Sequence, residues 1–311
     1  MSNDIRRDIL SHHRELKEVV TIYYEHAYRY GFYKVFEDFI DYCLAQYCPA
    51  LEYTLPDYIQ EKPDERHDFT KMLDAVIGEV RKKANLWTGD RSASGWYDPF
   101  GHFFESVASQ FGKAYRGQFF TPEPLCTMMA QMTVGDDKSV GKSLCEPACG
   151  SGRFLLAVHA QNPGFYCVSN DIDALCAKMT AVNYCLNGLV GEITCNDGLF
   201  PDKERFRFAY KCMPLIATNL GSVSAYKIMC MLSPSLAKQY ILIPIAYEES
   251  WYRLDNMFRQ KPIVLPPKKA CQDVLFDLDS IESVAVKKQP DVKKKQTANN
   301  SAANSPSLFD G

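Results

Sequence analysis

The chain has 311 residues, 46% of them hydrophobic, and is long enough to bury the core of one large domain or two smaller ones. No run approaches the roughly 18 apolar residues of a membrane helix. The N-terminal MSNDIRRDIL lacks the apolar core of a signal peptide, so we expect a cytoplasmic protein without a membrane partner. The net charge of -3 provides no overall basic field, so any DNA-binding surface has to be a local patch.

The twelve cysteines are scattered singly through apolar stretches, with no C-x-x-C pair. The closest pairs, Cys43 with Cys48 and Cys145 with Cys149, have the wrong spacing for a zinc ribbon. We therefore expect reduced, mostly buried thiols and no metal site.

Residues 1–115 are predicted to form a helical N-terminal region. Apolar side chains recur at helical spacing from Tyr23 to Phe32 and again from Val35 to Cys43, as in a packed helical core. The segment Asp68 to Asn85 predicts a further helix, which carries the basic cluster Arg81-Lys82-Lys83 near its end. The helix macrodipole alone favours this cluster, and contact with phosphate is the alternative.

Residues 116–270 alternate between short apolar runs and helical segments, which predicts an α/β fold with a doubly wound, mostly parallel sheet. In such sheets ligands bind beyond the carboxyl ends of the strands. After residue 245 only 262–265 has the pattern of a further strand, so we expect a sheet truncated at its C-terminal strands. The expected strands are 142–146, 165–170, 192–195, 215–218 and 240–245, and the expected helices are 122–132, 152–161, 174–186 and 222–239.

Residues 285–311 are rich in Lys, Asn and Ser and are predicted to be a disordered tail. Its lysines would add weak, salt-sensitive attraction to nucleic acid. The terminal Leu308-Phe309 resembles short peptides that dock on bacterial sliding clamps, as does the segment 272–276. A sliding clamp is therefore one candidate partner.

The most informative motif is Glu146-Pro147-Ala148-Cys149-Gly150-Ser151-Gly152, between an expected strand and an expected helix. Its glycines let a ligand pack against bare backbone beside the amides of a helix N-terminus. The motif lacks the G-x-G-x-x-G spacing of dinucleotide sites and the lysine of a phosphate-binding loop. Glu146 would repel a pyrophosphate and suit a cationic ligand. The motif therefore predicts a pocket for a cofactor without phosphate.

Two acids follow the next two expected strands. Asp171 stands about twenty residues beyond the glycines, where an acid can accept both ribose hydroxyls of a nucleoside. A helix N-cap by Asp171 or Asp173 is the alternative. Asp197, in Asn196-Asp197-Gly198, can accept from an exocyclic amine, although a tight turn would use the same residues.

An upstream motif, Gly117-Gln118-Phe119-Phe120-Thr121-Pro122, combines paired aromatics with residues that open helices. The aromatics can cover a ligand, and an ordinary helix start is the alternative.

In this order the motifs resemble the N6-adenine DNA methyltransferases, specifically the modification subunits of type I restriction-modification systems and their phage-like relatives. The resemblance starts at Asp98-Pro99-Phe100-Gly101, passes through Gly117 to Pro122 and Glu146 to Phe154, and ends with Asp171 and Asp197. It covers about residues 95–220 and implies a Rossmann-like class I methyltransferase fold.

The resemblance implies S-adenosyl-L-methionine as cofactor. It implies Glu146 near the amino group of the cofactor, Asp171 on the ribose and Asp197 on adenine N6, with the segment Gln118 to Pro122 closing over the methionine moiety. The cofactor-binding residues expected in this way are Gln118, Phe119, Phe120, Thr121, Pro122, Glu146, Ala148, Cys149, Gly150, Ser151, Gly152, Asp171, Ile172, Asp197 and Asn219.

The chain departs from the family at the catalytic motif. Family members have Asn-Pro-Pro-Tyr or Asn-Pro-Pro-Phe after the fourth strand, and this chain has Asn219-Leu220-Gly221-Ser222. The resemblance makes Asn219 and the Leu220 carbonyl the catalytic acceptors for the target amine, but Ser222 cannot stack on a flipped base. That loss removes about 1–3 kcal/mol of substrate binding unless an aromatic such as Tyr226 or Tyr247 substitutes.

The expected function is therefore S-adenosylmethionine-dependent methylation of adenine N6 in DNA, within a restriction-modification or mobile-element system. The expected partners are DNA and a specificity or restriction subunit. The alternative is a catalytically weakened or inactive cofactor-binding subunit with a regulatory or assembly role. Methylation of RNA or of a protein amide uses the same asparagine chemistry and stays open.

Overall fold

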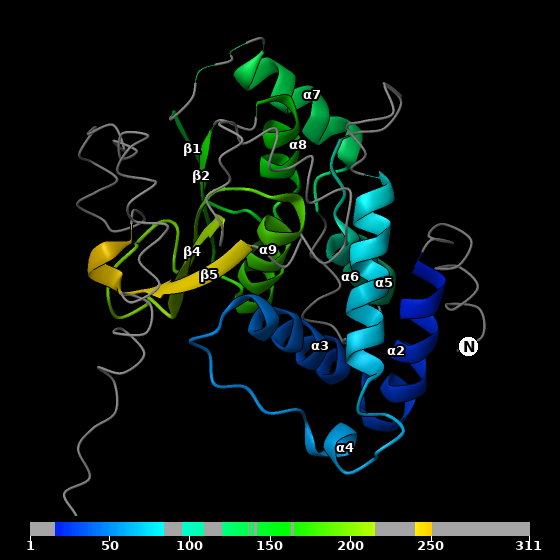
Figure 1. Cartoon of the computed structure of the whole chain (residues 1–311). Helices are drawn as coiled ribbons and strands as arrows, with labels where there is room; N and C mark the ends of the chain where they lie inside the picture. The colour runs from blue at the N-terminus through cyan, green and yellow to red at the C-terminus, as the bar shows by residue number, and fades with distance from the viewer. Residues whose placement is uncertain are drawn as a thin grey trace, which may run out of the picture. The chain divides into compact units, whose positions relative to one another are not determined.

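The computed structural model describes residues 16–83, 95–108, 120–135, 137, 139, 142–162, 165–214 and 240–250 (Figure 1). The chain divides into two units, Met1–Phe276 and Asp277–Gly311, and every described residue belongs to the first. The predicted boundary near residue 116, the segments 262–265 and 272–276 and the tail with Leu308-Phe309 lie outside the described residues.

The elements described between residues 16 and 108 are all helices. Gly31 separates the helices Lys17–Tyr30 and Phe32–Tyr47, and its φ of +98° is costly for any other residue. Its N–H donates to the Ala27 carbonyl at 2.9 Å and closes the helix Lys17–Tyr30. The helices are α2 (Lys17–Tyr30), α3 (Phe32–Tyr47), α4 (Asp57–Gln60), α5 (Asp68–Lys83) and α6 (Pro99–Val107).

Aromatic packing joins α6 to the earlier helices. The ring of Phe103 meets that of Tyr23 edge-on, with centroids 4.7 Å apart, and lies 5.6 Å from that of Phe36. Phe100 contacts Phe39 in the same buried cluster. Buried aromatic pairs of this geometry stabilise the fold by more than the burial of their apolar surface. They therefore hold α6 firmly against α2 and α3.

The second half of the described chain is a mixed α/β arrangement with a five-stranded sheet. Strands follow one another across the sheet in chain order; β1 pairs with β2 and β2 with β3 in parallel, whereas β3 with β4 and β4 with β5 are antiparallel. The elements are α7 (Glu123–Val134), β1 (Ser143–Glu146), α8 (Arg153–Gln161), β2 (Tyr166–Asp171), α9 (Ala174–Asn187), β3 (Gly191–Cys195), β4 (Phe208–Pro214), β5 (Tyr240–Ile245) and the short 3-10 helix η4 (Tyr247–Glu249).

The predictions for 142–146, 165–170, 192–195 and 240–245 are confirmed, as are the helices near 122–132, 152–161 and 174–186. The prediction of a mostly parallel sheet needs correction, because half of the strand pairings described are antiparallel. The connection 196–207 contains no helix, so the chain turns back into β4 beside β3 instead of crossing over.

The predicted strand 215–218 and helix 222–239 lie outside the described residues. Among the strands that are described, the order shows no reversal, so the doubly wound arrangement and the truncation stay predictions.

Helix α9 is almost entirely buried between the sheet and the N-terminal helices. Tyr240 of β5 donates to the Gly188 carbonyl at the end of α9 at 3.0 Å, and Lys178 of α9 pairs with Asp41 of α3 at 2.6 Å. These contacts fix the sheet and the helical region to one helix.

All ten cysteines in the described ranges are free thiols, and nine of them are buried, as the sequence predicts. The same ranges hold no cluster of three or more metal-ligating side chains. None of their helices has the length and apolar character needed to cross a bilayer.

Candidate functional site

A cavity of about 320 Å³ opens at the carboxyl ends of β1 and β2. Its volume is within the range of small-molecule pockets. The glycine turn, the residues that end the two strands and the segment before α7 all contribute to it. Its lining residues are Phe120, Thr121, Met129, Glu146, Ala148, Cys149, Gly150, Ser151, Arg153, Phe154, Asp171 and Cys176.

The glycine turn between β1 and α8 depends on two left-handed residues. Gly150 has a φ of +55° and Gly152 a φ of +90°, which other residues adopt only with strain. A Cβ atom on Gly150 would stand 2.8 Å from Cδ1 of Phe120, so this ring lies directly on bare backbone. The hydroxyl of Thr180, in α9, donates to the Gly150 carbonyl at 2.8 Å and so stabilises the turn.

Asp171 closes the turn from the neighbouring strand. Its Oδ2 accepts from the Gly150 N–H at 2.8 Å, and its Oδ1 accepts from the Asp173 N–H at 2.9 Å. The N-cap of α9 is Asp173, which accepts from the backbone of Leu175 and Cys176. The helix-capping alternative therefore applies to Asp173, and Asp171 is left as a wall of the cavity.

Glu146 and Asp171 give the cavity an acidic character. Burial raises the pKa of Glu146, a backbone hydrogen bond from Ala148 opposes that rise, and the nearby charge of Asp171 adds to it. Burial likewise raises the pKa of Asp171, against the hydrogen bonds from Asp173 and Gly150. Two desolvated carboxylates on one wall favour a ligand that brings positive charge.

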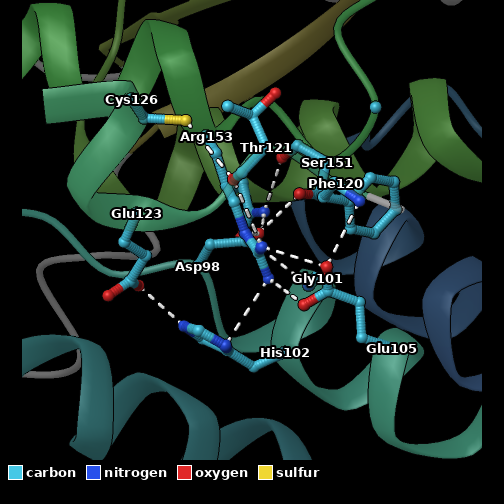
Figure 2. Close-up of polar contacts among 12 residues, drawn as sticks. Asp98, Gly101, His102, Glu105, Phe120, Thr121, Glu123, Cys126, Ser151 and Arg153 are labelled. Carbon is cyan, nitrogen blue, oxygen red and sulfur yellow. Dashed lines mark hydrogen bonds and ion pairs between the residues drawn. The ribbon is translucent and has the colours of Figure 1, made fainter. Parts of the chain in front are cut away.

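A buried ion network stands behind this wall (Figure 2). Arg153, the first residue of α8, pairs through Nε with Asp98 at 2.7 Å and through Nη2 with Glu105 at 2.7 Å. Asp98 is 0% exposed and also accepts from the Gly101 N–H, at 2.8 Å, and from the Ser151 hydroxyl, at 2.5 Å. The network joins α6 to the glycine turn.

Sequence reasoning includes Asp98 only through the resemblance, and it misses Arg153 and Glu105. One signal was available: Arg153 opens the otherwise apolar segment Arg153–Gln161, and a charge on a buried helix needs a partner. The partner itself cannot be read from the sequence, because Asp98 and Glu105 lie 55 and 48 residues away.

Eight of the predicted cofactor-binding residues line the cavity. They are Phe120, Thr121, Glu146, Ala148, Cys149, Gly150, Ser151 and Asp171. Gly152 is buried against Thr180, and Pro122 is the N-cap of α7. Gln118, Phe119, Asn219 and Leu220 lie outside the described residues.

Asp197 and Ile172 are not among the residues that line the cavity. Oδ1 of Asp197 accepts from the backbone of Leu199, at 2.9 Å, and of Phe200, at 3.2 Å, which is the tight turn that the sequence allows as the alternative. Ile172, Leu199 and Phe200 expose 64%, 84% and 64% of their surface at the ends of β2 and β3. Sequence reasoning does not single out Leu199 and Phe200.

Residues 96–229 match the N-6 DNA methylase family, and this range contains every lining residue of the cavity. The chain is 24% identical over 170 residues to the type I restriction enzyme MjaIX methylase subunit of Methanocaldococcus jannaschii. The alignment covers 51% of this chain and 28% of that relative, so the chain spans less than a third of its length. No solved structure matches the chain significantly. Residues 96–229, which carry the cavity, are therefore similar to the N-6 DNA methylase family.

Proposed function

We propose that the cavity binds S-adenosyl-L-methionine and that the chain transfers a methyl group to N6 of adenine in DNA. The observation that carries this proposal is the meeting of Glu146, the Gly150 backbone and Asp171 in one cavity. The match of residues 96–229 to the N-6 DNA methylase family supports the substrate and the reaction.

The cavity suits this cofactor in charge and in shape. S-Adenosylmethionine bears an ammonium and a sulfonium group, and Glu146 and Asp171 offer negative charge without a competing free cation among the described lining residues. Gly150 leaves a surface that a Cβ atom would fill. When bound, the cofactor supplies an electrophilic methyl group.

The proposed roles follow from the acceptors that remain free. Oδ2 of Asp171 accepts the Gly150 N–H and Oδ1 accepts the Asp173 N–H, and a carboxylate has about four acceptor positions, so Asp171 would also accept from the ribose hydroxyls. Glu146 would accept from the ammonium group, and the backbone of Ala148 to Gly152 would pack on the methionine moiety. Asp197, together with Ile172, would face the adenine ring.

On the substrate side, Asn219 and the Leu220 carbonyl would hold the target amine so that its lone pair faces the methyl group. Ser222 provides no stacking surface for a flipped base. Tyr247 is a poor replacement, because its hydroxyl donates to the Pro201 carbonyl at 2.8 Å and its ring packs on Phe206. Tyr226 is the remaining aromatic candidate.

The departure at Asn219-Leu220-Gly221-Ser222 favours a second candidate function. Here the chain binds the cofactor and acts as a regulatory or assembly subunit without transferring the methyl group. In both cases a specificity or restriction subunit is a proposed partner, since the relative is named as a subunit of a type I restriction enzyme.

The test supplies purified chain with S-adenosylmethionine labelled in its methyl group and with unmethylated DNA, in the presence and absence of a candidate specificity subunit. Mass spectrometry of the digested DNA should show labelled N6-methyladenine, and Asn219→Ala should abolish it. Cofactor binding in a calorimeter without transfer to any DNA selects the second function. No cofactor binding rejects both.

A further inference from the structure

Arg153 lines the cavity, yet its guanidinium has no donor left for a ligand. Nε donates to Asp98, at 2.7 Å; Nη1 donates to Glu105, at 3.2 Å, and to the Thr121 carbonyl, at 3.4 Å. Nη2 donates to the other oxygen of Glu105, at 2.7 Å, and approaches Nδ1 of His102 at 3.5 Å. These contacts account for all five N–H groups of the side chain. An arginine saturated in this way positions other groups.

The groups that it positions belong to the segment before α7. Glu105, held by Arg153 through both oxygens, accepts from the Phe120 N–H at 3.2 Å. The guanidinium carbon of Arg153 lies 5.5 Å from the centroid of the Phe120 ring, which in turn lies on Gly150. Phe120 is thus fixed at its N–H, at the following carbonyl and on its ring (Figure 2).

The charge on Arg153 is permanent. Burial lowers the pKa of its guanidinium, but Asp98 and Glu105 outweigh burial and raise the pKa above its ordinary value. His102 joins the same network: its Nε2 lies 2.7 Å from Oε1 of Glu123, and its Nδ1 lies 3.5 Å from Nη2 of Arg153. Glu123 is the first residue of α7, so the network also reaches that helix.

We infer that Arg153 and Glu105 form a clamp that holds Phe120 over Gly150 and thereby sets the affinity of the cavity for its cofactor. The inference rests on the proposed function, and it makes Arg153 and Glu105 positioning residues. A lysine at position 153 cannot replace Arg153 in the clamp, because one ammonium group cannot hold Asp98 and both oxygens of Glu105 in a fixed plane.

The first test needs no cofactor. Hydrogen exchange followed by mass spectrometry should show faster exchange at residues 120–123 in Glu105→Ala and in Arg153→Lys than in wild type, with no change at β3. Asp41→Ala is the matched control, because it removes the ion pair to Lys178 away from the cavity. Unchanged exchange at residues 120–123 in both clamp variants overturns the inference.

The second test is a double-mutant cycle on cofactor affinity, with Glu105→Ala, Phe120→Ala and the double variant measured by calorimetry. Glu105→Ala should weaken binding about tenfold in the wild-type background and less than about twofold beside Phe120→Ala, because the clamp acts through that ring. Glu105→Gln keeps an acceptor for the Phe120 N–H and should recover part of the affinity.

Additive effects in the cycle would assign Glu105 a general stabilising role and would reject the clamp. If wild type binds no S-adenosylmethionine, the proposed function fails, and the exchange experiment still decides whether the clamp exists.

Discussion

Oδ2 of Asp171 accepts a hydrogen bond of 2.8 Å from the Gly150 N–H, so the acid that ends β2 holds the turn that follows β1. The parallel register of the two strands, with Glu146 opposite Ser169, brings these two ends together. Because the bond fixes both partners, the carboxylate stands ready at the cavity wall before any ligand arrives.

Asp171→Asn should weaken the binding of S-adenosylmethionine by about tenfold or more. The substitution removes a negative charge and replaces one acceptor oxygen by an NH₂ group, which meets a backbone N–H instead of accepting from it. Hydrogen bonds to charged groups contribute about 1.5–3 kcal/mol. Calorimetry measures the effect, and Asp173→Asn is the control, because asparagine caps helices as well as aspartate does. Equal affinities in wild type and Asp171→Asn would reject the ribose assignment.

Glu146→Gln should stabilise the ligand-free protein and weaken cofactor binding about tenfold. Burial raises the pKa of Glu146, so at neutral pH the folded state carries a desolvated charge that the unfolded state hydrates freely. Glutamine removes that cost and also removes the partner of the ammonium group. Thermal unfolding with and without cofactor checks both effects. A lower melting temperature of the ligand-free variant contradicts the account.

The part of the site that the sequence predicts is the part that local chemistry determines. The positive φ angles at positions 150 and 152 require glycine. Glu146 and Asp171 are the last residues of strands that the short apolar runs predict. The sequence does not predict the strand Phe208–Pro214, because its position depends on pairing with β3 and on the lack of a helix in the connection before it.

The ion network is equally invisible to local reasoning. Arg153 meets Asp98 only because α6 is packed against the N-terminal helices through Phe103 and its neighbours. For Asp197 the local sequence allows two roles, a turn or a ligand contact, and does not choose between them. In the structure one oxygen of Asp197 accepts hydrogen bonds within the local turn.

Gly150→Ala should weaken cofactor binding by more than its effect on stability explains. Alanine at a φ of +55° costs about 1–2 kcal/mol of backbone strain. Its Cβ would also lie 2.8 Å from Cδ1 of Phe120, which is too close, so the ring would have to move. Gly31→Ala is a matched control, because Gly31 has a φ of +98° with open space around the added Cβ. Both variants should lose stability in urea unfolding, and only Gly150→Ala should lose affinity. If Gly31→Ala also lost cofactor affinity, the loss in Gly150→Ala could not be assigned to the Phe120 ring.

Asp98→Asn should destabilise the fold by about 3–5 kcal/mol, because it leaves the buried guanidinium of Arg153 without its fully buried charged partner. Four donors converge on Asp98: the Gly101 N–H, the Ser151 hydroxyl, Arg153 and Asn183. The midpoint of urea unfolding measures the loss. Asp202→Asn, in the exposed pair with Arg205, should cost less than about 1 kcal/mol. Similar costs for the two variants would show that burial does not govern the network.

Cofactor affinity and the stability of the ligand-free protein should respond to acid in opposite directions through Glu146 and Asp171. Both groups have a raised pKa in the folded state, so their contribution to stability grows as pH falls through the raised pKa values, which lie above the ordinary carboxyl values. In the same window protonation removes the charges that attract a cationic cofactor. Wild type should therefore lose affinity on acidification more steeply than Glu146→Gln, while the stability advantage of that variant shrinks. Calorimetry and thermal unfolding over this pH range measure the two trends. Parallel pH profiles for wild type and variant would show that the Glu146 carboxylate does not act on the ligand through its charge.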